Sequence, residues 1–88
     1  MRINGSVKEH LGTVLDKNYF QPRKLSIYRV AKETGISKKA LCGVLSGRLP
    51  LPVKEAMILA RYFGEKEDFF AYMQLQYELT FEKQQLSN

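Results

Sequence analysis

The side chains best suited to specific chemistry are Ser37, Lys38, Lys39 and Cys42, which open a segment of helical periodicity. Each lysine can donate to guanine O6 and N7, or it can neutralise a backbone phosphate. Ser37 is first a helix cap, with a phosphate or base contact as a second role. Cys42 offers apolar contact to a thymine methyl group. This set predicts contacts with double-stranded DNA; simple solvent exposure of the lysines is the alternative.

Five other side chains flank this segment as candidate phosphate contacts: Arg23, Lys24, Tyr28, Arg29 and Arg48. Arginine, lysine and hydroxyl groups supply most contacts to phosphate. Residues 1–50 hold ten Lys and Arg against three acids, a net charge of +7, whereas residues 51–88 hold four against six, a net −2. The positive half is suited to attract phosphate. For each of the five residues, the alternative is a solvated surface side chain.

Other kinds of chemistry have little support in the sequence. Cys42 is the only cysteine, so no intramolecular disulfide can form, and no activating cluster around it indicates a redox role. The only histidine, His10, is expected to be a surface or capping residue, and no Cys/His set could hold zinc. We expect no enzymatic activity and no bound metal ion or cofactor. With no apolar run long enough to span a membrane and no signal peptide, we expect a cytoplasmic protein.

Two short helices joined by a tight turn must position the candidate DNA contacts. Apolar spacing predicts helices over residues 27–34 and 38–45, with Ser26 and Ser37 as N-caps. Gly35 can adopt the positive φ that the turn requires. The buried side of this unit is expected to consist of Val30, Ala31, Ile36, Leu41, Val44 and Leu45. The spacing is that of a helix-turn-helix, whose second helix enters the major groove; an αα-hairpin of any helical domain is the alternative.

The remaining pattern completes an all-α, five-helix domain over residues 12–83. Pro22 ends a first helix over residues 13–20, and Gly64 ends a fourth over residues 53–63 that has Pro52 in its first turn. A fifth has the acidic segment 65–68 at its start and runs to about residue 83. Residues 1–11 are expected to form an irregular arm, which is either flexible or contacts phosphate through Arg2 or Lys8. Residues 84–88 are expected to form a frayed tail. Gly43, inside the third helix, indicates close approach of DNA or another helix.

Three blocks of the chain carry a resemblance to a known family. They are HLGTVL at 10–15 with FQP at 20–22 and LS at 25–26; Ala31, GIS at 35–37, Leu41, Leu45 and SGR at 46–48; and Ala56, LAR at 59–61, Gly64, FF at 69–70, Gln74 and YEL at 77–79. Together they resemble the HigA family of antitoxins, within the phage-repressor-like (Xre) helix-turn-helix regulators. The third block is the most particular to that family.

The resemblance implies a phage-repressor-like fold and a homodimer that represses its own operon and neutralises a RelE-like mRNA-cleaving toxin. Some relatives act only as regulators, so a stand-alone regulator is one alternative. The chain departs from the family in having Phe69-Phe70 in place of Phe-Trp, and the small residues Ala40, Cys42 and Gly43 in the recognition helix. The second departure leaves a toxin-binding module with little DNA binding as the other alternative.

The predicted fifth helix carries more apolar side chains than one face can hold. Phe70, Met73, Tyr77 and Phe81 form one row, and Tyr72, Leu75 and Leu79 form another. We expect one row to pack on the domain and the other on a partner, most simply a second copy of the chain. The candidate dimerisation residues are Phe70, Tyr72, Met73, Leu75 and Leu79, with the second row expected to face outward. A toxin on this surface, or a larger monomer core, is the alternative.

Overall fold

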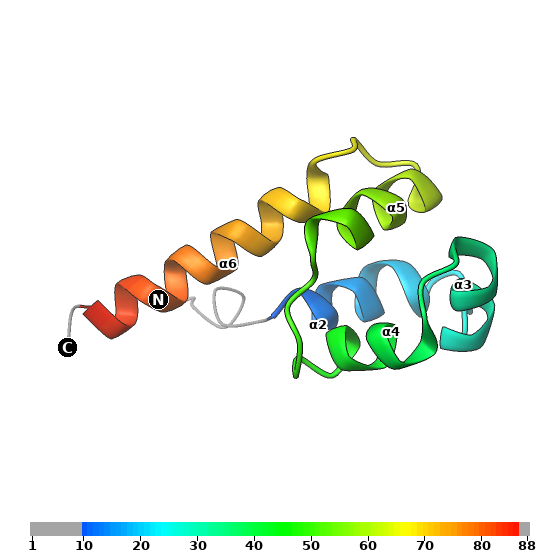
Figure 1. Ribbon diagram of the computed structural model, residues 1–88, viewed down its shortest axis with the longest axis horizontal. Coiled ribbons are helices and arrows are strands. Elements are labelled where there is room, and N and C mark those ends of the chain that lie inside the picture. Colours follow the sequence, from blue (N-terminus) through cyan, green and yellow to red (C-terminus); the bar gives the residue numbers. More distant parts are fainter. Residues whose placement is uncertain (1–9, 87–88) are drawn as a thin grey trace.

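The computed structural model describes residues 10–86, and in this part of the chain every regular element is a helix, with turns between them and no strand (Figure 1). The elements are α2 (Leu11–Leu15), η1 (Asp16–Phe20), α3 (Ile27–Thr34), α4 (Lys38–Leu45), α5 (Val53–Phe63) and α6 (Phe69–Leu86). The expected all-α fold class is confirmed. The predicted ranges of α3, α4 and α5 agree with the structure, because each helix has a local start and stop signal, except that Pro52, expected in the first turn of α5, is its N-cap.

The first helix begins earlier than the sequence predicted. It starts at Leu11 rather than Thr13, and His10 is its N-cap: the His10 Nδ1 accepts from the Thr13 backbone N–H at 3.2 Å. The expected capping role of His10 is confirmed. Leu11 is buried in the core, so the expected arm ends before it; residues 1–9 lie outside the described part. The helix widens to a π turn over η1 before it ends at Phe20, ahead of Pro22.

One hydrophobic core joins all the elements. Its buried members are Leu11, Leu15, Tyr19, Phe20, Val30, Ile36, Leu41, Val44, Leu51, Ala56, Leu59, Ala60, Phe63 and Phe70. Tyr19 lies edge-on to Phe70, with ring centroids 5.2 Å apart, and Phe63 contacts both of these rings. These contacts join η1, α5 and α6, and α4 adds Leu41 and Val44 to the same core.

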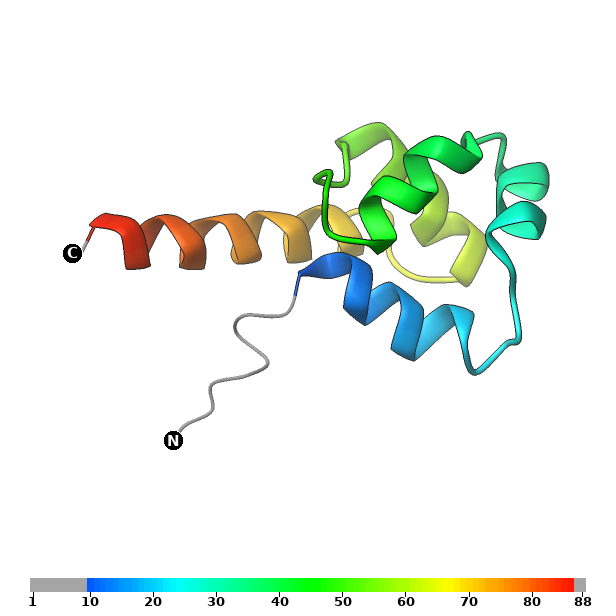
Figure 2. The same ribbon diagram turned by 90° about the horizontal axis from the view of Figure 1, so that it is seen from below.

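Helix α6 packs on the bundle with its first turns only, and its C-terminal half extends away from it (Figures 1 and 2). Gln74 joins α6 to the bundle, since its Oε1 accepts from the Leu51 backbone N–H at 3.1 Å. The helix continues to Leu86, so the expected frayed tail from residue 84 is wrong for 84–86; residues 87–88 lie outside the described part. No helix of the described residues is long and apolar enough to cross a membrane.

Gly43 is explained by a contact that the sequence did not predict. A Cβ at this position would lie 2.4 Å from Leu49 Cδ1, and the Leu49 N–H donates to the Gly43 carbonyl at 3.0 Å. Within the described structure, the close neighbour is therefore the turn after α4, and Gly43 is buried beneath it. The expectation that this glycine meets DNA or a neighbouring helix is wrong.

Candidate nucleic-acid interface

The turn between α3 and α4 is fixed by hydrogen bonds at each of its residues. The Thr34 hydroxyl donates to the Val30 carbonyl at 2.7 Å and accepts from the Ile36 N–H at 3.2 Å. Gly35 has a φ of 83°, in the left-handed region where a Cβ is disfavoured. Ser37 then caps α4 by accepting from the Ala40 N–H at 3.0 Å. The start of α4 therefore has a defined position relative to α3.

Helix α4 has one buried side and one exposed side. Leu41 and Val44 are buried against the bundle, whereas Lys38, Lys39 and Cys42 are exposed. Figure 2 shows α4 crossing the front of the bundle, with no other element over it. The structure therefore brings the predicted base-contacting side chains onto one open surface, at the capped end of a short helix.

Tyr28, in the first turn of α3, pairs with Lys38, in the first turn of α4. The Lys38 Nζ lies over the Tyr28 ring, 5.3 Å from its centroid. A lysine ammonium over an aromatic face is attracted by the ring quadrupole and keeps its full charge. Tyr28 is 63% exposed, so the pair lies at the protein surface with the ammonium accessible.

Arg29 also lies on α3, but it has a carboxylate partner. Its Nε donates to Glu33 Oε2 at 3.2 Å, and the Tyr62 hydroxyl donates to the other oxygen of the same carboxylate. These bonds lower the pKa of Glu33, with the bond from Tyr62 as the largest cause. The bond to Glu33 in turn raises the pKa of Tyr62. The charge of Arg29 is therefore partly compensated, which makes it a weaker candidate for phosphate than Lys38 or Lys39.

Arg23 is not brought to the α4 surface. Its guanidinium lies over the rings of Phe63 and Tyr19, 5.1 and 5.7 Å from their centroids, at the junction of η1 and α5. Lys24 follows it in the exposed turn before α3 with a φ of 54°, which is unusual for a residue other than glycine. The structure therefore gives Arg23 a packing role that the sequence did not predict.

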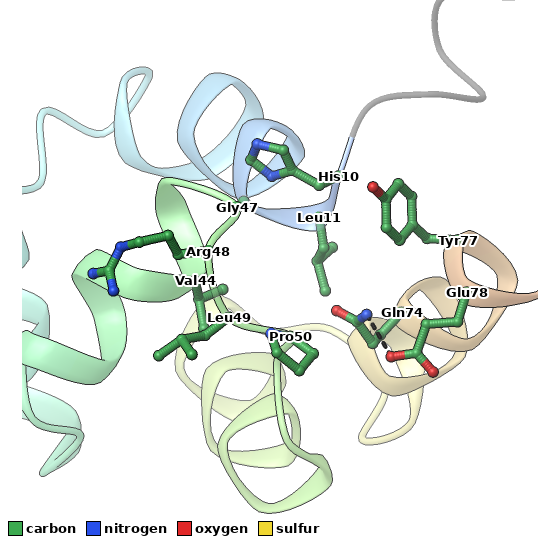
Figure 3. Close-up of a pocket in the computed structure, with 11 residues that line it drawn as sticks. His10, Leu11, Val44, Gly47, Arg48, Leu49, Pro50, Gln74, Tyr77 and Glu78 are labelled. Atoms are coloured by element: carbon green, nitrogen blue, oxygen red, sulfur yellow. Dashed lines mark hydrogen bonds between the residues drawn. The ribbon is translucent and has the colours of Figure 1, made fainter. Parts of the chain in front are cut away.

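Arg48 lies in the turn after α4, beside a hollow of ≈ 200 Å³ between this turn, α2 and α6. The hollow is lined by His10, Leu11, Tyr77 and Gln74 among others, and the Gln74 Nε2 donates to Glu78 at 2.8 Å. Figure 3 shows the Arg48 guanidinium pointing away from the hollow. Arg48 therefore remains a candidate phosphate contact at the C-terminal end of α4.

The predicted dimerisation residues divide between core and surface. Tyr72, Leu75 and Leu79 are 63%, 49% and 45% exposed, and we call them the outer row. Phe70 is fully buried by its own chain, so including it in an interface is wrong. Met73 is half-buried against the core and stays a candidate.

The start of α5 enlarges the surface formed by the outer row. Val53, at the first position of α5, is 65% exposed, and a groove of ≈ 410 Å³ lies between it, Tyr72 and Leu75. Leu51, which is buried, forms part of the groove's lining. The exposed apolar area therefore extends from α6 onto a second helix.

Among residues 10–86, no three His, Cys, Asp or Glu side chains gather into a set that could hold a metal ion. No family model, curated protein or solved structure matches this chain. The features that bear on function are therefore the α4 surface and the outer row, together with the motifs of the sequence.

Two features of these surfaces were missed by reasoning from sequence. The Tyr28–Lys38 pair has a signal in retrospect, because both residues occupy the first turn of consecutive helices in a tight hairpin. The exposure of Val53 has no such signal, since an apolar residue at the start of an amphipathic helix is ordinarily assigned to the core.

Proposed function

We propose that this chain is a sequence-specific DNA-binding protein of the phage-repressor-like helix-turn-helix type. The observation that carries the proposal is the exposed side of α4, where Lys38, Lys39 and Cys42 lie together on a helix capped by Ser37. In helix-turn-helix proteins, the N-terminal residues of the second helix contact base edges in the major groove. The basic composition of residues 1–50 supports DNA as the ligand.

The protein is proposed to bind its operator as a homodimer and to repress transcription. One helix-turn-helix makes few base contacts, and two copies on a symmetric site double them. A symmetric dimer requires a patch that fits itself. The outer row of Tyr72, Leu75 and Leu79, with the neighbouring Val53, supports this arrangement because it is apolar and exposed. It also belongs to the half of the chain that has a net negative charge.

The resemblance to the HigA family supports a further role as an antitoxin that neutralises a RelE-like mRNA-cleaving toxin. The adjacent reading frame provides the test. If it encodes a small basic RelE-like protein, expression of that protein alone should stop growth, and co-expression of this chain should restore it. Failure to restore growth would leave the stand-alone regulator, while rescue by a variant that binds no DNA would favour the toxin-binding module.

DNA binding itself can be tested without knowledge of the operator. Repeated selection of random-sequence duplexes by the full-length chain should enrich a two-fold symmetric site. Its half-sites should lie about one helical turn, roughly 34 Å, apart. Recovery of duplexes with no shared sequence after several rounds would contradict sequence-specific binding.

A further inference from the structure

We propose that Tyr28 holds Lys38 beside α3, so that Lys38 neutralises backbone phosphate while Lys39 and Cys42 meet the base edges. The inference rests on the proposed function and assigns separate DNA contacts to the residues of the α4 surface. Both lysines open the same helix, and their positions in the sequence alone do not distinguish their roles.

The Lys38 side chain has a defined direction. Its ammonium lies 5.3 Å from the centroid of the Tyr28 ring, and Tyr28 belongs to α3, so the side chain is directed towards the neighbouring helix. Lys39 lies one residue further along α4, and within the described residues it makes no ion pair, hydrogen bond or ring contact. Because successive residues are about 100° apart around a helix axis, the two lysines leave α4 in different directions.

The expected path of the DNA backbone distinguishes the two lysines. In helix-turn-helix docking, the first helix of the motif crosses the backbone while the start of the second helix faces the bases. Lys38 is held against the helix that crosses the backbone. Lys39 and Cys42 are three residues apart and both exposed on α4. Cys42 is also four residues from Lys38, so it is the contact of Lys38 with the Tyr28 ring that assigns the two lysines different roles.

Arg29 and Lys38 differ in how far their positive charges are compensated by neighbouring groups. Arg29, also on α3, has its charge partly compensated by Glu33 at 3.2 Å. The Tyr28 ring restricts Lys38 without compensating its charge, because an aromatic face carries no net charge. Lys38 therefore keeps a full positive charge in a restricted position, as a phosphate contact requires.

The experiment compares binding of two duplexes, the selected operator and a random sequence, by fluorescence anisotropy over a range of salt concentrations. Lys38→Ala should weaken both complexes by a similar factor and lower the salt slope by about one unit. Lys39→Ala should reduce the preference for the operator by about tenfold or more. Tyr28→Leu, which removes the ring, should reproduce part of the Lys38→Ala effect, and Tyr28→Phe, which keeps it, should bind like the wild type.

The double variant Tyr28→Leu/Lys38→Ala tests the coupling directly. It should bind like Lys38→Ala alone, because the ring acts only through the lysine. Additive losses, or equal losses in Tyr28→Phe and Tyr28→Leu, would overturn the inference in favour of a direct contact by the tyrosine hydroxyl. A larger loss of operator preference in Lys38→Ala than in Lys39→Ala would also overturn it. Failure of the wild type to bind either duplex would instead refute the proposed function.

Discussion

The Cα of Gly12 in α2 lies directly against the backbone of Val44 in α4. A Cβ at position 12 would be 2.1 Å from the Val44 carbonyl oxygen and 2.7 Å from that of Leu45. The two helices therefore meet backbone to backbone, with space for a hydrogen atom and nothing larger. This contact fixes how α4 lies on the bundle, and so how its exposed side is presented.

Gly12→Ala should destabilise the domain by about 3 kcal/mol, because the atoms it meets belong to the backbone and have no rotamers to change. Chemical denaturation followed by circular dichroism measures the loss. Gly64→Ala is the control, since that glycine has open space around it and a φ of 80°, so only the cost of a left-handed residue, about 1 kcal/mol, is expected. Equal losses in the two variants would contradict the close contact of α2 with α4.

This glycine illustrates what could be predicted from the sequence and what could not. The bounds of α3, α4 and α5 depend on residues next to each helix end, such as Ser26, Ser37 and Gly64, and local signals were sufficient for them. The need for glycine at position 12 depends on Val44, which is distant in sequence. Its neighbour Leu11 was placed outside the helix for the same reason, since only its tertiary contacts show that it is buried.

Gly35→Val should destabilise the domain by about 1–2 kcal/mol through backbone conformation alone. The position has a φ of 83° and no atom within 4 Å of an added Cβ, so steric overlap contributes nothing. Gly35→Asn should cost less, because asparagine tolerates this conformation better than a β-branched residue. Thermal melting of the pair checks both values. If Gly35→Asn melts below Gly35→Val, the turn does not have the described conformation.

The stability of the protein should fall as the pH rises from about 10 to about 12, through the titration of Tyr19. Burial, together with the hydrogen bond of 2.7 Å from its hydroxyl to Glu65, raises the pKa of Tyr19 to about 12. The unfolded chain loses this proton near pH 10, so between the two values the folded state holds the extra proton and stability is lost. The loss should be about 1–2 kcal/mol. Denaturation of Tyr19→Phe, which has no such proton, should lack this component; an identical alkaline loss in that variant would contradict the assignment.

The outer row gives a prediction about assembly. Tyr72→Asp and Leu79→Asp should give folded monomers with much weaker operator binding, because both side chains are exposed and their replacement leaves the core intact. Phe70→Asp is the core control and should unfold the domain, since its side chain is fully buried. Sedimentation measures the oligomeric state of each variant, and circular dichroism measures whether it is folded. Dimers that persist in both outer-row variants would exclude this surface as the interface.

Phe81 shows why the faces of α6 could be predicted only in part. The helical period groups Phe81 with Phe70 and Tyr77, in the row expected to pack on the domain. Phe70 is buried and Tyr77 half-buried, but Phe81 is 49% exposed, because α6 has left the bundle by that point (Figure 1). The expectation is wrong for Phe81, whose substitution should leave the fold intact. The helical period of the sequence identifies which residues of α6 share a row. It does not show the point along α6 at which contact with the bundle ends.

The central claim, that the exposed side of α4 binds DNA, is tested most directly by matched charge reversals. Lys39→Glu and Lys66→Glu change the net charge equally, but Lys39 lies on the exposed side of α4 and Lys66 on the turn between α5 and α6, at the opposite edge of the bundle (Figure 1). The measurement is the affinity of each variant for the selected duplex at one salt concentration. We expect Lys39→Glu to lose specific binding by about 100-fold or more and Lys66→Glu to bind nearly as the wild type does. Equal affinities in the two variants would contradict the claim.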